Sequence, residues 1–378
     1  MKIVPLFVFW CLWFLNFSVR VIISPLLPLI EDEFALSHAF AGGLFFFIYF
    51  GSILAMFSSG YISLRIGYKR SIAASYLILI ATLFCLRYAQ NYPSFAFLCF
   101  FLGVGVGMYL PCAIPLITAI FDPGKWGKAI SFHETAAGFS FLAIPLLTVF
   151  AMQYFHWRAL FLILSGSCLI IVMVFFIFSP DPRPVKEKKT GLSFILRRPE
   201  FWIITVLWTF AAVDSMGIYN IIPLFLVKEK GMPLEFSNNI FGISRIGGFL
   251  AMIVIGFLLD RYRIKSILAV IILATGITTI GLALAQKFWL LMTMLILQAT
   301  FCIIFFPAGL VAISKLTSPN ERSTFTGTTM GISGIFGTGL APFILGALAD
   351  VWNFQIGIFA LGVLTIITCL LLKILQDI

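Results

Sequence analysis

The stretch "GYISLRIGYKR" at residues 60–70 returns in altered form as "GFLLDRYRIK" at residues 256–265. The two copies begin 196 residues apart, and each lies between two long apolar runs. The same offset of 196 residues separates Pro111 from Pro307, which also lie in apolar runs. A period of this length predicts that the chain is built from two diverged copies of one unit.

The composition places these copies in a membrane. Of the 378 residues, 61% are hydrophobic and only 11% are charged, and the mean hydropathy is +1.09. Soluble domains carry about 25% charged residues. The apolar runs are continuous and about 20 residues or longer, which predicts transmembrane helices rather than the alternating strands of a barrel. The expected fold class is therefore an all-α membrane protein.

Polar breaks in the hydropathy pattern divide the chain into twelve predicted spans. They cover residues 4–29, 38–63, 71–88, 94–121, 129–153, 159–179, 201–227, 237–259, 266–285, 288–315, 325–348 and 355–373. The first run lacks the small-residue cleavage pattern of a signal peptide, so it is taken as the first span.

The longest polar interruption divides the spans into two groups of six. It is the Pro- and Lys-rich segment "SPDPRPVKEKKTGLSFILRRPE" at residues 179–200. We expect an N-terminal six-helix bundle over 1–179, a cytoplasmic linker over 180–200 and a C-terminal six-helix bundle over 201–378. Two parallel repeats related by an axis along the membrane normal are an arrangement of secondary transporters, with a cavity between the halves.

The distribution of basic residues predicts the orientation. With the N-terminus inside, the cytoplasmic segments hold 18 Lys and Arg residues and the outer segments hold five. This excess places both termini in the cytoplasm of a multi-pass protein of a bacterial-type cytoplasmic (inner) membrane. It also accounts for the net charge of +10 without a nucleic-acid partner. We expect a monomer.

Enzyme chemistry has no support in the sequence. The seven cysteines are scattered singly in apolar runs, without the spacing of metal ligands. The glycines of "GVGVG" at residues 103–107 lie inside an apolar span rather than after a strand, so they indicate close helix packing rather than a dinucleotide loop. We therefore expect no enzyme activity, no cofactor and no metal.

At the repeated loops the chain resembles the major facilitator superfamily, whose loop after the second helix reads G-x-x-x-D-R-x-G-R-[RK]. In the first copy Leu64 stands where the Asp is expected, and the residues that match are Gly60, Arg65, Gly67, Lys69 and Arg70. The second copy keeps Asp260 and Arg261, while Arg263 replaces the later Gly. In that family the loop is thought to latch the two halves through charge pairs. The resemblance implies a conformational latch formed by Gly60, Arg65, Gly67, Arg70, Asp260 and Arg261.

Three charged residues lie deep inside the predicted spans, where a charge costs several kcal/mol. Arg20 lies 15 residues after Pro5 and Arg245 lies 15 residues before Asp260, which is ~22 Å along a helix axis in each case. Asp214 lies 13 residues into the seventh span. A guanidinium matches a carboxylate or phosphate, and two cations against one acid favour an anionic substrate. The alternative is a structural pair between an Arg and Asp214.

A narrower resemblance concerns the first and fifth spans. Arg20 precedes Pro28 by eight residues, as in helix one of the organophosphate and anion:cation symporter branches, where that Arg binds the substrate. The segment "SFHETAAG", which contains His133, resembles helix five of the glycerol-3-phosphate transporters. Those proteins carry a second Arg in helix seven, where this chain has Ser215. The comparison therefore favours a carboxylate over a phosphate ester.

Further polar residues complete the predicted site. Asn16 lies one helical turn before Arg20, Tyr49 occupies the repeat position of Arg245, and Tyr219 is a third candidate for substrate contact. The candidates for proton coupling are Asp214, His133 and Glu134. A nearby Arg lowers the pKa of a carboxyl and burial raises it, and His titrates near neutrality. For His133 a purely structural bond to a neighbouring helix is an equal alternative, and for Glu134 the alternative is a salt-bridged group near the cytoplasmic end of the span.

The sequence thus predicts a secondary transporter that moves a small organic anion, a carboxylate before others, by proton-coupled symport and alternating access. Its partners are the substrate, H⁺ and the lipid bilayer. The alternatives are an exchanger of organophosphates or inorganic anions, and an efflux protein for hydrophobic compounds, although the helix-five signature of drug/proton antiporters is missing. A non-transporting sensor is a further alternative of another class.

Overall fold

A computed structural model describes residues 3–121, 125–179 and 192–375. Regular structure in these residues is entirely helical, and twelve helical segments are long and apolar enough to cross a membrane. This confirms the predicted fold class. The first segment extends to Phe34, beyond the expected end at residue 29. Residues 180–191 of the predicted linker lie outside the described residues, and a short helix and the start of the seventh segment occupy the rest of it.

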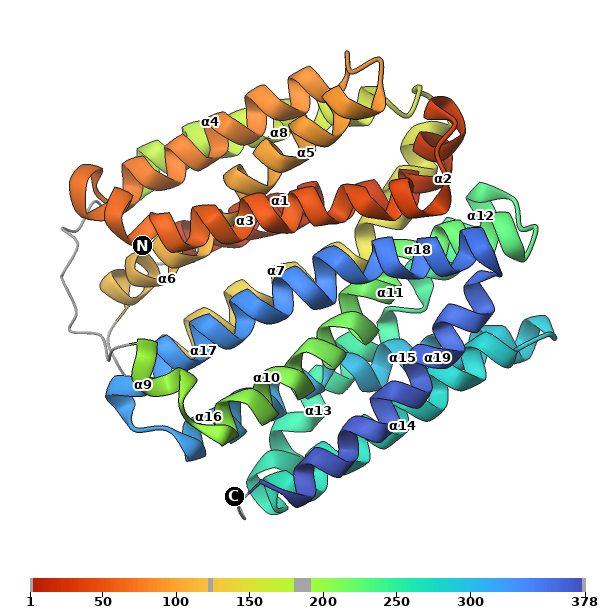
Figure 1. Cartoon of the computed structure of the whole chain (residues 1–378). Coiled ribbons are helices and arrows are strands. Elements are labelled where there is room, and N and C mark those ends of the chain that lie inside the picture. Colours follow the sequence, from red (N-terminus) through yellow and green to blue (C-terminus); the bar gives the residue numbers. More distant parts are fainter. Residues whose placement is uncertain (1–2, 122–124, 180–191, 376–378) are drawn as a thin grey trace. The chain divides into compact units, whose positions relative to one another are not determined.

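Residues 1–34 and 47–186 form one compact unit, called unit 1 here. In Figure 1, α4 lies beside both α5 and α8, and the contacts between these helices agree with that view. The buried Tyr76 hydroxyl donates to the carbonyl of Leu12 and so joins α4 to α1. The helices of unit 1 are α1 (Ile3–Val21), α2 (Ile23–Phe34), most of α3 (His38–Ile66), α4 (Tyr68–Leu86), α5 (Tyr92–Gly107), α6 (Tyr109–Ile120), α7 (Trp126–Met152) and α8 (Ala159–Phe178).

Residues 35–46, which include the start of α3, and residues 187–378 form unit 2. Figure 1 shows α14 and α19 side by side, and these two helices contact each other extensively. Three segments of unit 2 are π-helical, and one is a 3-10 helix. The elements are α9 (Leu192–Leu196), α10 (Pro199–Ala212), π-helix η2 (Val213–Gly217), α11 (Ile218–Leu224), π-helix η3 (Phe225–Glu229), α12 (Leu234–Ile243), α13 (Ile246–Arg261), α14 (Ile264–Leu284), α15 (Phe288–Ile303), α16 (Phe305–Leu316), α17 (Pro319–Ser333), π-helix η4 (Gly334–Leu340), α18 (Ala341–Val351), α19 (Phe354–Thr368) and 3-10 helix η5 (Cys369–Lys373).

The two units repeat the same helix interruptions. One span breaks at Met108, between α5 and α6, and its counterpart breaks at Ile304, between α15 and α16. The breaks are 196 residues apart, and each lies three residues before a proline, Pro111 or Pro307. Proline has no N–H for the carbonyl four residues earlier, so it interrupts the helix at that point. The repeat found in the sequence is therefore also a repeat of local structure.

Small residues let α3 and α5 pack closely in unit 1. A Cβ atom built on Gly103 would meet the carbonyl oxygen of Ile48, and one on Gly107 would meet that of Ser52. The two glycines are one turn apart and therefore share one face of α5. Close contact through glycines is a known means of joining helices in lipid, where apolar burial alone does not discriminate between partners. The predicted packing role of the "GVGVG" segment is confirmed.

The surfaces of both units expose large apolar side chains. Ile177 in unit 1 and Phe257 in unit 2 are each 75% exposed, which a water-soluble protein rarely tolerates over many residues. Apolar rings also fill the interiors, such as Phe201 and Phe305 in unit 2. Apolar side chains on the surface as well as inside are expected where the solvent is lipid.

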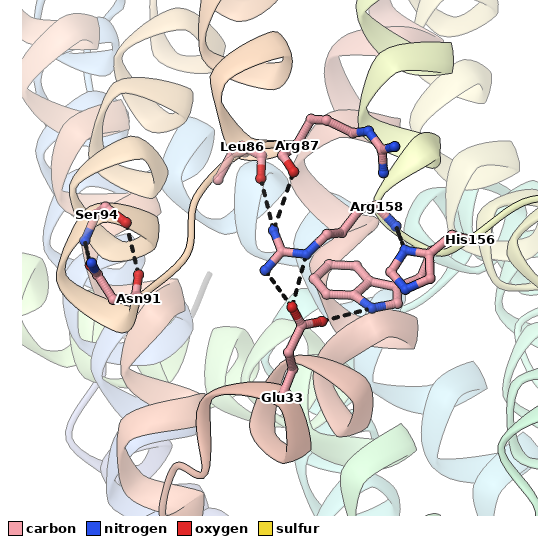
Figure 2. A network of polar contacts seen from close by, with 8 residues as sticks. Glu33, Leu86, Arg87, Asn91, Ser94, His156 and Arg158 are labelled. Carbon is pink, nitrogen blue, oxygen red and sulfur yellow. Dashed lines mark hydrogen bonds and ion pairs between the residues drawn. The ribbon is translucent and has the colours of Figure 1, made fainter.

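A polar network joins helix ends in unit 1 (Figure 2). The Arg158 guanidinium donates to Oε1 of Glu33 through Nε at 3.0 Å and Nη2 at 2.7 Å, and the Trp157 indole donates to Oε2 at 3.1 Å. The Nη1 atom of Arg158 donates to the carbonyls of Leu86 and Arg87, both at 3.4 Å, where α4 ends. A cation at a helix C-terminus also interacts favourably with the helix dipole. One side chain therefore fixes the start of α8 against the ends of α2 and α4.

We expect Arg158→Met to lower the free energy of unfolding by about 1–3 kcal/mol, because Glu33 loses a charged partner that donates two hydrogen bonds, and the last carbonyls of α4 lose a donor. The loss is smaller than for a fully buried pair because the Glu33 side chain is 40% exposed. Thermal unfolding of the purified protein measures it. Arg87→Met is the matched control, because only the Arg87 main chain takes part in the network. Equal losses in both variants would contradict this role.

Candidate substrate and ion-coupling sites

Arg20 lies where the first span is interrupted. Helix α1 ends at Val21 and α2 begins at Ile23, because Pro25 supplies no N–H to the carbonyl of Val21. The guanidinium carbon of Arg20 lies 5.0 Å from the ring centre of Phe17 and 5.7 Å from that of Tyr49. Its Nε is buried without a hydrogen-bond partner, and it forms no ion pair with any described residue. Arg20 is therefore a cation held by aromatic faces with donor capacity for an anion.

Asn16 lies one turn before Arg20 and is fully buried. Its Nδ2 donates to the carbonyl of Val106 on α5 at 3.3 Å, while its Oδ1 has no partner among the described residues. The amide nitrogen therefore serves the contact between α1 and α5. The second N–H of the amide nitrogen can still donate to an anion, and the amide oxygen can accept from another donor.

Arg245 has similar surroundings in unit 2. It follows α12 at a break formed with Ser244 and directly precedes α13. Its guanidinium carbon lies 5.0 Å from the ring centres of both Tyr219 and Phe241. Both Nε and Nη2 are buried without partners in the described part of the chain. Arg245 also is a cation held by two aromatic rings.

The Arg and the Tyr of these two sites occupy opposite spans in the two repeats. In unit 1 the cation is on the first span and the tyrosine is on the second, whereas in unit 2 the tyrosine is on the first span of the repeat and the cation is on its second. Tyr49 and Arg245 are 196 residues apart, so they occupy equivalent positions. Each unit thus contains one Arg and one Tyr in contact, from equivalent spans.

Asp214 is fully buried on the π-helix η2. Its Oδ1 accepts from the Thr279 hydroxyl of α14 at 3.1 Å, and its Oδ2 accepts from the Thr365 hydroxyl of α19 at 2.6 Å. Gln298 of α15 donates to its main-chain oxygen at 2.7 Å. Asp214 forms no ion pair with Arg245 or any other described residue, so the structural pair considered from the sequence is absent there. π-Helical turns occur often at functional sites.

His133 belongs to a local cluster in unit 1. Its Nε2 lies 3.1 Å from the Tyr109 hydroxyl, its Nδ1 lies 3.1 Å from Oε1 of Glu134, and its ring stacks on Trp13 at 5.4 Å. Trp13 also donates to Oε2 of Glu134 at 3.4 Å. The imidazole itself is fully buried. The adjacent candidates from the sequence are therefore directly bonded, with Trp13 as a member that sequence reasoning missed.

The repeated loops differ in how far their side chains can be described. Gly67 has φ 88, a backbone conformation suited to glycine, and directly precedes α4. The Arg65 guanidinium lies 4.3 Å from the ring of Tyr61, and Arg70 is exposed. A Cβ on Gly60 would meet no atom within 4 Å.

In the second loop, the backbone of Asp260 and Arg261 ends α13, and Arg261 is exposed. The side chain of Asp260 lies outside the described residues. Arg65, Arg70 and Arg261 form no ion pair with described residues, so the latch stays a prediction.

The twelve spans, the helix breaks repeated in both units and the buried charged residues are the features of a membrane transporter. The sequence matches the family model described as Major Facilitator Superfamily over residues 9–287 and 236–377. The chain therefore belongs to the Major Facilitator Superfamily, and it is a multi-pass membrane protein.

Relatives in sequence include NiaP of Bacillus subtilis (strain 168), 24% identical over 85% of this chain and 83% of that protein. The niacin transporter NiaP of Acinetobacter baylyi is 28% identical over 46% of this chain and 39% of that protein. The 4-hydroxybenzoate transporter PcaK of Pseudomonas putida is 19% identical over 87% and 82%. The multidrug resistance protein MdtL of Shewanella sp. (strain ANA-3) is 23% identical over 91% and 89%.

Solved structures share the fold. A bacterial homologue of the human lysosomal transporter Spinster, in an inward-facing and unoccupied conformation, has a TM-score of 0.82 at 16% identity, over 99% of this chain and 96% of that one. The D-xylose-proton symporter has a TM-score of 0.82 at 16% identity, over 99% and 98%. At this identity the likeness concerns the fold alone.

Proposed function

We propose that the protein transports a small aromatic carboxylate by alternating access. The observation that carries the proposal is Arg20, whose guanidinium rests against Phe17 and Tyr49 and keeps a buried Nε without a described partner. An aromatic acid combines a carboxylate, which suits the guanidinium fork, with a flat ring, which suits aromatic side chains. Niacin and 4-hydroxybenzoate, named for two of the relatives, are acids of this kind.

Arg245 supports the same substrate class from the second unit. Its contacts with Tyr219 and Phe241 repeat the combination of a cation and aromatic rings. A phosphate ester is less favoured because Ser215 stands where the organophosphate transporters have their second Arg. Efflux of hydrophobic compounds is the second candidate, and similarity to MdtL favours it. A neutral drug would leave the two arginines without a role.

Uptake into proteoliposomes tests the substrate class. 4-Hydroxybenzoate and nicotinate should accumulate, whereas 4-hydroxybenzamide, which keeps the ring and loses the charge, should not compete with them. Glycerol 3-phosphate tests the organophosphate alternative, and export of a lipophilic dye tests efflux. Competition by the amide equal to that by the acid would contradict an anion site.

For coupling we propose proton symport, with Asp214 as the proton carrier and the pair His133 and Glu134 as an accessory group. Asp214 is buried and accepts hydrogen bonds only from neutral hydroxyls among the described side chains, so its charge is costly there and a proton removes that cost. The proposed orientation has both termini in the cytoplasm, in an inner membrane, and the proposed state is a monomer.

The variant Asp214→Asn should lose concentrative uptake driven by an inward pH gradient, because an amide keeps the shape of the carboxyl but does not take up the proton. Counterflow of labelled against unlabelled substrate without a gradient should persist. Uptake by this variant that still rises with the pH gradient, as in the native chain, would exclude Asp214 as the carrier. His133→Gln, assayed in the same way, tests the accessory group.

A further inference from the structure

A small cavity adjoins Asp214 inside unit 2. Its volume is about 10 Å³, which is the space that one water-sized group needs. Three threonines and the carboxylate supply its polar lining, and the other lining residues are mainly apolar, Leu207 and Phe305 among them. The threonines are Thr275 of α14, Thr365 of α19 and Thr368 at the end of α19.

Not every oxygen around this cavity takes part in a hydrogen bond. The Thr275 hydroxyl is buried and has no hydrogen-bond partner, although this residue lines the cavity and is 3% exposed. The Thr365 hydroxyl lies 2.6 Å from Oδ2 of Asp214, and Thr368 donates to the carbonyl of Thr365 at 2.7 Å. A hydroxyl can rotate its hydrogen away and offer its lone pairs to a cation.

Two residues outside the cavity lining fix the carboxylate in place. Thr279 donates to Oδ1 at 3.1 Å, and Gln298 donates to the main-chain oxygen of Asp214 at 2.7 Å. The carboxylate is thus held at its far oxygen and at its backbone, while Oδ2 faces the threonines. A held acidic oxygen beside neutral oxygens is the arrangement that hard cations prefer.

The charge of the cluster selects the ion. One carboxylate balances one positive charge, whereas a divalent ion would leave a surplus charge in apolar surroundings. No group of three or more His, Cys, Asp or Glu that could hold a metal occurs among the described residues, so transition-metal ligands are not gathered here. A proton would neutralise Asp214 but would leave the Thr275 oxygen without a partner.

We propose that Asp214, Thr275 and Thr365 bind a sodium ion in this cavity, with Thr279 and Gln298 as positioning residues. Na⁺ and H⁺ compete for the same carboxylate, so the ion site concerns the coupling step of the proposed function and rests on that function only there. Binding of the ion itself requires no substrate.

The test uses the purified full-length chain in detergent without substrate. Thermal unfolding is followed in NaCl, KCl and choline chloride at equal ionic strength, and binding of ²²Na⁺ is measured directly. We expect Na⁺, and neither K⁺ nor choline, to raise the melting temperature. Thr365→Val should weaken Na⁺ binding by about tenfold or more, and Asp214→Asn should abolish it.

Thr278→Val is the matched control, because Thr278 lies on α14 and, among the described residues, its hydroxyl bonds only to carbonyls of that helix. Its Na⁺ affinity should equal that of the native chain. Stabilisation by lower pH without any effect of Na⁺, or equal effects in the two valine variants, would overturn the proposal. Sodium binding without uptake of any aromatic acid would overturn the proposed function and leave this site intact. Anion uptake driven by a pH gradient, with no ²²Na⁺ bound, would overturn the sodium site and leave the proposed function intact.

Discussion

Arg20→Ala is expected to lower the apparent affinity for 4-hydroxybenzoate by about 10²–10³-fold in the uptake assay, which corresponds to about 3–4 kcal/mol for a desolvated carboxylate that loses its charged partner. The substitution should cost little stability, because Arg20 forms no ion pair with any described residue that would be left uncompensated. Uptake kinetics and thermal unfolding of the same preparation measure the two effects separately.

Two further variants separate charge from geometry at this site. Arg20→Lys keeps the charge and loses the planar fork, so it should recover only part of the affinity. Tyr49→Phe keeps the ring beside the guanidinium and should remain close to the native protein if the face of the ring, rather than its hydroxyl, is what matters. Normal affinity in Arg20→Ala would refute the anion site in unit 1, whatever substrate is used.

The repeat is the part of the fold that the sequence predicted best. Prolines act on their own helix, so Pro111 and Pro307 favour the breaks at Met108 and Ile304, although Pro145 lies inside the continuous helix α7. The offset of 196 residues carries over from sequence to helix ends because both copies keep the same spacing. Arg20 could likewise be identified, since a charge in an apolar run contradicts the hydropathy around it.

The partners of the buried charges could not be predicted. Thr279 and Thr365 are 65 and 151 residues from Asp214 along the chain, on helices α14 and α19. In a helix of a soluble protein the polar face shows which side points to the solvent. A membrane span presents apolar residues both to lipid and to its neighbouring helices, so this signal is missing. The hydropathy of α14 therefore does not show which of its faces is turned inward, so the contacts of its threonines could not be predicted.

The His133 cluster shows the same limit at shorter range. Adjacent residues of a helix point about 100° apart, which suggests different surroundings for His133 and Glu134. In the structure the flexible Glu134 side chain returns to the imidazole, and both meet Trp13 on α1. A tryptophan in a span rich in aromatic residues gives no signal of such a role. Whether the cluster moves protons or only joins α7 to α1 is decided by the His133→Gln assay.

Gly103→Val should prevent stable folding of unit 1, with a loss in the free energy of unfolding of at least about 3 kcal/mol. Even the first added carbon would meet the carbonyl oxygen of Ile48, which is backbone and cannot turn aside. Helices α3 and α5 would then have to separate along their contact, which also passes Gly107 and Ser52. Low yield of folded protein and a lower melting temperature are the measurements.

Gly166→Val is the matched control, because a Cβ on Gly166 in α8 would meet no atom within 4 Å. It also replaces a helical glycine in a span, so it carries the same change in backbone freedom and β-branching without the contact. We expect Gly166→Val to remain near native stability. If the two variants lost stability equally, valine in the helix rather than contact between α3 and α5 would be responsible, and the close packing would have no energetic role.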